Sequence, residues 1–535
     1  MGVSLGILSE GPFSVEVSMA SSGLRAVCLI VPLLGLVSPA HAQLIPVKTI
    51  PIAQGDQFQI FPTNNLGMGS VSIALADSLS DPFANPAMGT RIAGARFFSS
   101  PTLYSVSRNA GGGRSLPFAV WARRAGWYGG LALALQQVDP SRPPQADGFF
   151  AIDVAVPNAV RPVAVDPSPI PGPDLRAHGN EYGFAMVGRD LPGTKISIGA
   201  SMLWTGLHAL DGVDLLYAGS QRVAQDGHAL DVRLGAVKAW PGQWGDRSLE
   251  ALVLHNDFAA THTVTYVDTF WDPGLEAFGQ RARVEHNADR TQTWGLHFKY
   301  TLPFTASGWR LGWIATLNQS SHPKIPNYEL ANVPAIPRDP GHTTAFDFGI
   351  GLSKVRGRAM FGVDFVYEPI RSYTWADADR PMSTVSGDTL APGAKTVENH
   401  FHFSNTLLRL GAGRDIELHG VGKTLGLQLG LMLRTIHYNL SQQDNVQALQ
   451  RRLTTGWMEW TPTWGMSVRF PEFEIRYAGH VTHGAGRPQS TFFVPWGTRD
   501  AALAGGTILA APNGPLNLTH VNTTTHQISL ALPLH

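Results

Sequence analysis

Cysteine is almost absent from this sequence. Its one cysteine, Cys28, falls in an apolar stretch near the N-terminus that we expect to be cleaved off. The mature chain would then hold no thiol, which excludes disulfide bonds, a thiol nucleophile and a cysteine metal site.

Charge is also scarce. Asp, Glu, Lys and Arg make up 15% of the 535 residues, and 40 basic residues balance 40 acidic ones, whereas a soluble domain carries roughly 25% charged residues. A neutral chain has no bulk attraction for nucleic acid, so we expect no nucleic-acid partner. With so few charged residues, charged side chains alone cannot satisfy the large surface of this chain.

Recognisable catalytic motifs are missing. The sequence has no Gly-x-Ser-x-Gly nucleophile elbow and no phosphate-binding loop. His480 and His483 invite a metal assignment, but in a strand two residues three apart point to opposite faces. We therefore predict that the protein is not an enzyme and that it holds no cofactor and no metal.

The N-terminal region has the features of an export signal. Arg25 precedes an apolar run over residues 27–37, and Ser38 to Ala42 end in the small-x-small pattern of a signal-peptidase site. A transmembrane anchor is the alternative, but the run is too short to span a bilayer. We predict a signal peptide over residues 1–42, with Met19 as an alternative start.

From about Ala93 onward, apolar and polar residues alternate with period two in runs of about ten residues. The run from Leu425 to Leu433 is the clearest, because leucine occupies every odd position. A helix would scatter these leucines, whereas a strand places them on one face. Similar runs begin at Trp294, Trp309, Phe346 and Phe361.

The connections between these runs alternate between short and long. Short turns are expected near residues 124–126, 191–193, 303–308, 355–357 and 470–471, and long polar loops over 139–180, 257–290, 320–342, 369–399, 437–454 and 483–524. This alternation is typical of outer-membrane barrels, and strands can cross hydrocarbon only in a closed ring. The sequence predicts an all-β fold, a transmembrane antiparallel β-barrel of about 14–16 strands over residues 93–535, in the bacterial outer membrane.

The 14 tryptophans point the same way, because indole rings favour the headgroup zone of a bilayer. A soluble sandwich or propeller is the alternative, and there the rings would be ordinary core aromatics. We interpret as interfacial girdles the tryptophans near expected strand ends: Trp121, Trp127, Trp204, Trp240, Trp294, Trp309, Trp457, Trp460 and Trp464.

A small-residue stretch, Leu66 to Ala87, lies between the signal and the first strand. It has glycines that allow tight turns, then small residues, then an Asn-Pro-Ala sequence. This pattern resembles the N-terminal hatch of the long-chain fatty acid transporter family of outer-membrane barrels, whose relatives include a barrel subunit of a secretion system. The resemblance implies fourteen strands and a hatch over residues 43–92 inside the lumen, with these residues in the hatch motif: Gly67, Gly69, Asp77, Asn85, Pro86 and Ala87.

The resemblance also implies a function. In that family the hatch blocks the lumen, and an apolar ligand captured from outside leaves through a lateral opening in the wall. We therefore predict passive uptake of hydrophobic small molecules such as long-chain fatty acids or hydrocarbons, with membrane lipids and this ligand as partners. The alternative is a protein-secretion or assembly partner whose long extracellular loops, such as residues 142–173, bind other proteins.

Polar residues opposite the apolar faces would point into the lumen. Their signs are mixed, which suits mutual pairing and a grip on a plug, and no ring of one sign argues for ion selectivity. We interpret them as braces of the lumen, with substrate binding as the alternative: Asp231, Arg233, His297, Lys299, Arg310, Asp347, Asp364, Glu368, Arg434, Glu474 and Arg476.

Overall fold

The computed structural model of the protein describes most of the chain after the expected signal. The described residues are 44–49, 51–53, 55, 57–139, 178–211, 221–272, 274, 277–322, 340–378, 381–418, 423–488 and 518–534. All of them fall in one compact unit that extends from Ala40 to His535.

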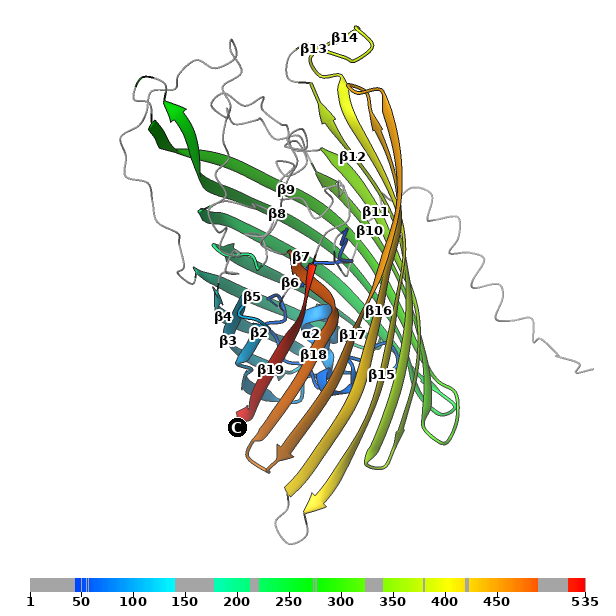
Figure 1. The fold of residues 1–535 in the computed structure, drawn as a ribbon. Coiled ribbons are helices and arrows are strands. Elements are labelled where there is room, and N and C mark those ends of the chain that lie inside the picture. The colour runs from blue at the N-terminus through cyan, green and yellow to red at the C-terminus, as the bar shows by residue number, and fades with distance from the viewer. Residues whose placement is uncertain are drawn as a thin grey trace, which may run out of the picture. The chain divides into compact units, whose positions relative to one another are not determined.

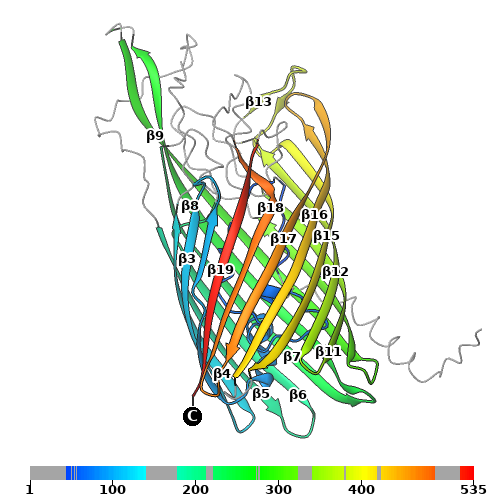
Figure 2. The ribbon, with the colours of Figure 1, turned by 60° about the horizontal axis from the view of Figure 1, so that its bottom comes forward.

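The described strands form a closed antiparallel barrel (Figures 1 and 2). Two short pieces, β1 and β2, both pair with β3 on one side and β19 on the other, so together they make the first strand of a ring of sixteen. Sixteen is the upper end of the predicted range. The strands of the ring are β1 (Ala95–Ser99), β2 (Thr102–Val106), β3 (Gly112–Arg124), β4 (Trp127–Asp139), β5 (His178–Leu191), β6 (Ile196–Leu207), β7 (Arg222–Gly242), β8 (Gly245–Asp272), β9 (Ala277–Pro303), β10 (Trp309–His322), β11 (Gly341–Arg356), β12 (Ala359–Asp377), β15 (Lys395–Leu418), β16 (Lys423–Asp444), β17 (Leu449–Arg469), β18 (Glu474–Pro488) and β19 (Leu518–Leu534). A separate small hairpin joins β13 (Met382–Ser383) to β14 (Thr389–Leu390).

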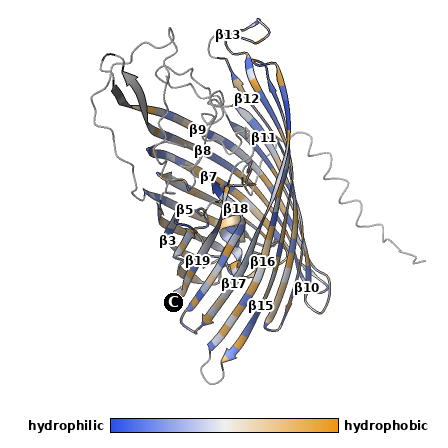
Figure 3. Ribbon diagram, viewed as in Figure 1, coloured by the Kyte–Doolittle hydropathy of each residue, from blue (hydrophilic) through white to orange (hydrophobic). Residues whose placement is uncertain are grey.

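Many large apolar side chains on the ring are exposed, as the alternation predicts, and hydrophobic and hydrophilic residues alternate along the strands (Figure 3). In the leucine run of β16, Leu429 is 69% exposed, and Trp294 and Phe348 on other strands are half exposed. Their neighbours in sequence are turned inward and are buried or half-buried. A belt of exposed apolar residues on a closed sheet is the surface that a bilayer solvates.

Trp121 is a correction to the predicted girdles. It is only 2% exposed and faces the interior, where it packs against Phe83 and Phe184. Strand-end position could not separate an inward ring from an outward one, because a shift of one residue changes the face. Other rings do lie outside, and Trp240, Tyr300 and Trp313 form a continuous stack on β7, β9 and β10.

Several predicted loops are strands instead. Residues 257–272 and 277–290 belong to β8 and β9, which stay paired up to Asp272 and Ala277, and most of 437–454 belongs to the paired ends of β16 and β17. Pairing also continues into 369–399 and 483–524 at their ends. Beyond a bilayer both strand faces meet water, so the alternation stops although the ladder continues. The predicted loops 139–180 and 320–342 fall mostly outside the described residues.

The N-terminal segment, residues 44–92, packs against strands all around the ring. Its short helices are η2 (Leu66–Met68), α2 (Asp81–Ala84) and η3 (Pro86–Arg91). The first contacts β15 to β18 and the last contacts β4 to β7, on the far side of the barrel. Figure 1 shows α2 enclosed by strands. Among the described residues, no helix combines the length and the apolar character needed to cross a membrane.

Candidate functional site

The turn at Gly67 and Gly69 is bound through its main chain. The Thr463 hydroxyl on β17 donates to the Gly67 carbonyl over 3.0 Å and accepts from the Gly69 N–H over 2.8 Å. Gly69 has φ +67°, a left-handed conformation that glycine adopts without steric cost. The Gln428 amide donates to the Asn64 carbonyl over 2.9 Å. Barrel side chains therefore satisfy backbone groups that no secondary structure of the segment would satisfy.

Residues 72–74 are held in the same way by the wall on the next strands. The Asp364 carboxylate on β12 accepts from the N–H groups of Ser72 and Ile73, at 2.7 and 3.1 Å. Lys299 donates to the Ser72 carbonyl over 3.0 Å. Ser353 donates to the carbonyl of residue 74 over 2.8 Å. These bonds come from three strands, are charge-assisted at Asp364 and Lys299, and fix the segment in one position.

Inward-facing glycines make room for this part of the segment. Gly411 on β15 pairs with Gly362 on β12 on one side and with Gly430 on β16 on the other. A Cβ atom at Gly411 or Gly430 would overlap the main chain at Met68, and one at Gly362 would overlap Val71. A side chain at these positions would occupy the space that the segment fills, so glycine leaves the inner surface of the wall flat here. Similar close approaches to Ile73 occur at Gly312, Gly349 and Gly351.

Asp77 organises the bend that follows. Its carboxylate accepts from the Thr63 hydroxyl and the Asn64 N–H, both over 2.6 Å, and from the N–H groups of Leu79 and Ser80. One buried carboxylate thus joins two stretches of chain and caps the turn before α2.

Asp81 lies at the start of α2. It is 8% exposed, accepts from the Asp77 N–H over 3.1 Å and pairs with Arg91 over 3.1 Å. Burial raises the pKa of Asp81 to about 6, and Asp77 and Glu250 add to the increase, while Lys299 and Arg91 oppose it.

The Asn85-Pro86-Ala87 sequence sits on the opposite wall. Asn85 caps η3 by accepting from the Ala87 N–H over 3.1 Å. The paired glycines Gly199 and Gly235 of β6 and β7 lie directly beneath, and a Cβ at either would overlap this sequence. The Tyr128 hydroxyl lies 3.2 Å from the Ala87 carbonyl.

Arg233 binds the segment just before that sequence. It donates to the carbonyls of Phe83 and Ala84 over 3.2 and 3.0 Å, and Asp231 holds its guanidinium at 2.7 and 3.0 Å. The ion pair orients the donor, and the segment supplies the acceptors. As at Asp364, the barrel side chain contacts main-chain atoms.

An aromatic cluster lies between the segment and the first strands of the barrel. Phe61 and Phe83 come from the segment and stack at 3.8 Å between ring centroids. Phe98, Trp121 and Phe184 come from the wall and surround Phe83 at 4.8 to 6.0 Å. This is the largest apolar contact between the segment and β1 to β5. The cluster is a close-packed apolar environment.

The wall next to this cluster has a discontinuity in its hydrogen-bond ladder. Between β1 and β2, Ser100 and Pro101 lie opposite Leu116 and Pro117 of β3 if the register on either side is continued. Neither proline has an N–H to donate. The Ser100 hydroxyl is buried without a hydrogen-bond partner. We call these four residues the seam.

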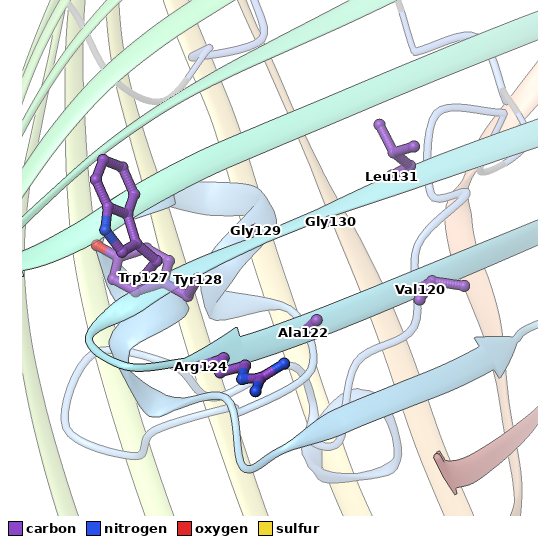
Figure 4. A pocket seen from close by; sticks show the side chains of 8 residues that line it. All are labelled: Val120, Ala122, Arg124, Trp127, Tyr128, Gly129, Gly130 and Leu131. Atoms are coloured by element: carbon purple, nitrogen blue, oxygen red, sulfur yellow. The ribbon is translucent and has the colours of Figure 1, made fainter. Parts of the chain in front are cut away.

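A shallow hollow of about 430 Å³ lies on the outer surface of β3 and β4 (Figure 4). Val120, Ala122, Trp127, Gly129 and Leu131 are among the residues that line it. These residues alternate in sequence with Trp121 and Tyr128, which face the aromatic cluster inside. The wall is therefore thin and apolar on both sides beside the seam.

The predicted lumen residues divide into two groups. The first group contacts the segment or holds a residue that does: Asp231, Arg233, Lys299, Asp364, Glu474 and Arg476. In it, Arg476 donates to the Asn64 side chain and pairs with Glu474 at 2.6 Å. In the second group, Arg434 pairs with Glu368 at 3.0 Å and His297 with Thr316 at 2.8 Å, while Asp347 is buried and Arg310 is half-buried.

Sequence reasoning missed Tyr128, Thr463, Ser353 and the inward glycines. Glycines at alternate positions on the inward face are a usable signal, because a strand gains nothing from them unless something approaches closely. His480 is buried, whereas His483 stacks on the exposed Trp460, so the two face opposite ways as predicted. Within the described ranges no group of three His, Cys, Asp or Glu could hold a metal ion.

Comparisons with known proteins give structural matches only. No family model matches the sequence, and no curated protein matches it. The structure is similar to a Pseudomonas aeruginosa FadL homologue, with TM-score 0.43, 12% identity, and coverage of 90% of this chain and 100% of that one. It is similar to the Ralstonia pickettii toluene transporter TbuX, with TM-score 0.37, 11% identity, and coverage of 89% and 100%. It is also similar to the FrpB iron transporter from Neisseria meningitidis, with TM-score 0.31, 10% identity, and 82% coverage of both chains. Similarities at this level leave function to be inferred from the residues of the chain.

Proposed function

We propose that this protein is an outer-membrane channel for passive uptake of hydrophobic small molecules, such as long-chain fatty acids or hydrocarbons. The N-terminal segment would act as the hatch that closes its lumen. A belt of exposed apolar side chains around a closed ring supports the membrane location. The polar grip on main-chain atoms at Asp364, Thr463 and Arg233 supports the role of the segment.

The observation that carries the proposal is the position of the aromatic cluster. It joins the hatch to the wall at Phe98 and Trp121, two to four residues from the seam. An apolar molecule gains no free energy from a watery pore, so a route from apolar cluster to apolar wall to lipid suits it better. Movement of Phe83 with the hatch would open space in the cluster. At the adjacent seam the backbone ladder to β3 is interrupted, and the Ser99 hydroxyl donates to the Pro117 carbonyl over 2.7 Å.

A disulfide across the seam tests this route. Thr102 and Ser115 are buried cross-strand partners just above it, and the mature chain has no cysteine of its own. We expect the Thr102→Cys, Ser115→Cys double variant to take up radiolabelled oleic acid normally when reduced and at least about tenfold more slowly when oxidised, because a cross-link prevents separation of the strands. Uptake into cells that express the protein is the measurement.

The matched control is Thr343→Cys, Ser372→Cys on β11 and β12. These are also buried, paired and inward-facing, with their hydroxyls 2.7 Å apart. Oxidation there should leave uptake unchanged. Equal uptake by the oxidised and reduced seam variant would overturn the release route, and a lack of uptake by the unaltered protein would overturn the transport function.

Secretion or assembly of other proteins remains the second candidate. It is favoured by the paired extension of β8 and β9, which continues to Asp272 and Ala277 far from the segment. A docking role at such extensions does not depend on the seam. Oxidation of the Thr102→Cys, Ser115→Cys variant would then leave secretion or assembly of the other proteins unchanged.

A further inference from the structure

The outer wall changes character toward the long connections of β11, β12 and β15 to β17. Phe348, Phe365 and Tyr367 are exposed and apolar. A few residues farther along the same strands, several of the exposed side chains are basic or imidazole-bearing, among neutral polar ones such as Asn439, Ser441 and Thr454. We call this set the basic patch: His342, Arg371, Lys395, His400, His402, His437 and Arg452.

Strand register brings the patch together. His342 pairs with Tyr373, Tyr373 with His400, His400 with Ser441, and Ser441 with Arg452, so one row crosses five strands. The row below it pairs Arg371 with His402. All of these residues share the outward face, because alternate positions in each strand point the same way.

Two of the cations in the patch are unpaired. Arg371 and Arg452 have no acidic partner within the part of the chain that the structure describes. Lys395 pairs with Glu398 at 3.3 Å and donates to the Tyr373 hydroxyl. The carboxylates near this surface are Glu398 and, at the end of β12, Asp377. The surface therefore keeps an excess of positive charge.

An aromatic shelf lies within the patch. Tyr373 stacks with His400 at 4.5 Å and with Trp375 at 5.1 Å, and Lys395 lies 4.9 Å from the Tyr373 ring centroid. Rings with a polar edge beside long cationic side chains are the arrangement found where lipid tails end and headgroups begin. Arg371 is four residues beyond the apolar Tyr367, about 13 Å along the strand.

We propose that the basic patch binds the phosphate-bearing headgroup of an anionic lipid in the outer leaflet. Arg371 and Arg452 are three strand intervals apart, about 14 Å, and are offset by one row, about 7 Å, along the strands, so a headgroup with two phosphates, or two neighbouring lipids, can contact both. Arginine forms paired hydrogen bonds with phosphate oxygens, and the tails extend down the apolar wall below. The site rests on the membrane location proposed above and is independent of what the lumen transports.

Native mass spectrometry of the full chain in detergent tests the site, with dioleoylphosphatidic acid as the probe and dioleoylphosphatidylcholine as its neutral counterpart. We expect the unaltered protein to retain phosphatidic acid in preference to phosphatidylcholine. The Arg371→Gln, Arg452→Gln variant should need at least about tenfold more phosphatidic acid for the same occupancy, because two charge-assisted contacts are lost.

The matched control is Arg124→Gln, Lys238→Gln, which removes the same charge from exposed positions at the opposite end of the barrel. It should retain the lipid as the unaltered protein does. Equal loss in both variants, no preference over phosphatidylcholine, or equally strong binding of inorganic phosphate would each overturn the lipid site. Oleic acid uptake by the Arg371→Gln, Arg452→Gln variant separates this outcome from the proposed transport, since uptake should continue.

Discussion

Single glycines decide where the N-terminal segment can lie. Gly411 on β15 faces Met68 of the segment, and a side chain at this position would overlap the main chain of the segment. Valine suits a strand, so Gly411→Val should leave the barrel intact while it displaces the segment at a cost of about 1–3 kcal/mol. We expect more frequent channel openings in planar-bilayer conductance recordings.

Gly183 of β5 provides the comparison for Gly411. A Cβ there meets nothing within 4 Å, so Gly183→Val adds the same side chain without a collision. Its recordings should match those of the unaltered protein. Identical recordings from the Gly411 and Gly183 variants would show that the glycines do not position the segment.

At the scale of secondary-structure elements, the sequence predicts strands well where one strand face is apolar and fails where neither is. The Leu425 to Leu433 run faces outward as expected. The predicted loop 257–290 forms strands over 257–272 and 277–290, where no sustained alternation of apolar and polar residues indicates a strand. Trp121 was assigned to the wrong face for a different reason, since its environment depends on Phe83 from a distant part of the chain. The partners of Asp364 and Thr463 are equally nonlocal, so spacing alone could not find them.

We expect the free energy of unfolding to depend on pH through Asp81, which lies at the start of the short helix α2. Burial raises the pKa of Asp81 to about 6 from its ordinary 3.8, so the folded protein binds this proton more tightly than the unfolded chain does. The free energy of unfolding should therefore fall as pH rises from about 4 through 6, by up to about 3 kcal/mol. Urea unfolding in lipid vesicles at pH 4.5 and 7.5, for the unaltered protein and Asp81→Asn, measures this.

Asparagine mimics the neutral form, so the Asp81→Asn variant should lose less stability over this range. Asp388→Asn, at an exposed position between β13 and β14, removes the same charge and should behave like the unaltered protein. If the stability difference between Asp81→Asn and the unaltered protein were the same at both pH values, Asp81 would not be the titrating group.

For the whole molecule, the width of the ring makes the N-terminal segment necessary to close the lumen. Barrels of sixteen strands are wide enough to leave an aqueous channel when nothing fills them. A protein without residues 43–92 should therefore conduct ions steadily in planar bilayers, whereas the full chain should stay closed. Heat-modifiable mobility on gels would show that the shortened barrel has formed, and a formed barrel without conductance would contradict the role of the segment as the closure.

The pairing of the first strand with the last has a consequence for biogenesis. Gln527 donates to Thr102, 425 positions away in the chain, so the ring cannot shut until its final strand has been delivered. The segment inside contacts strands on every side, and a shut cylinder offers no side entry for a folded piece of chain. We expect maturation to follow a set order, in which the leading residues bind to a curved, still open sheet before the last strand closes the ring.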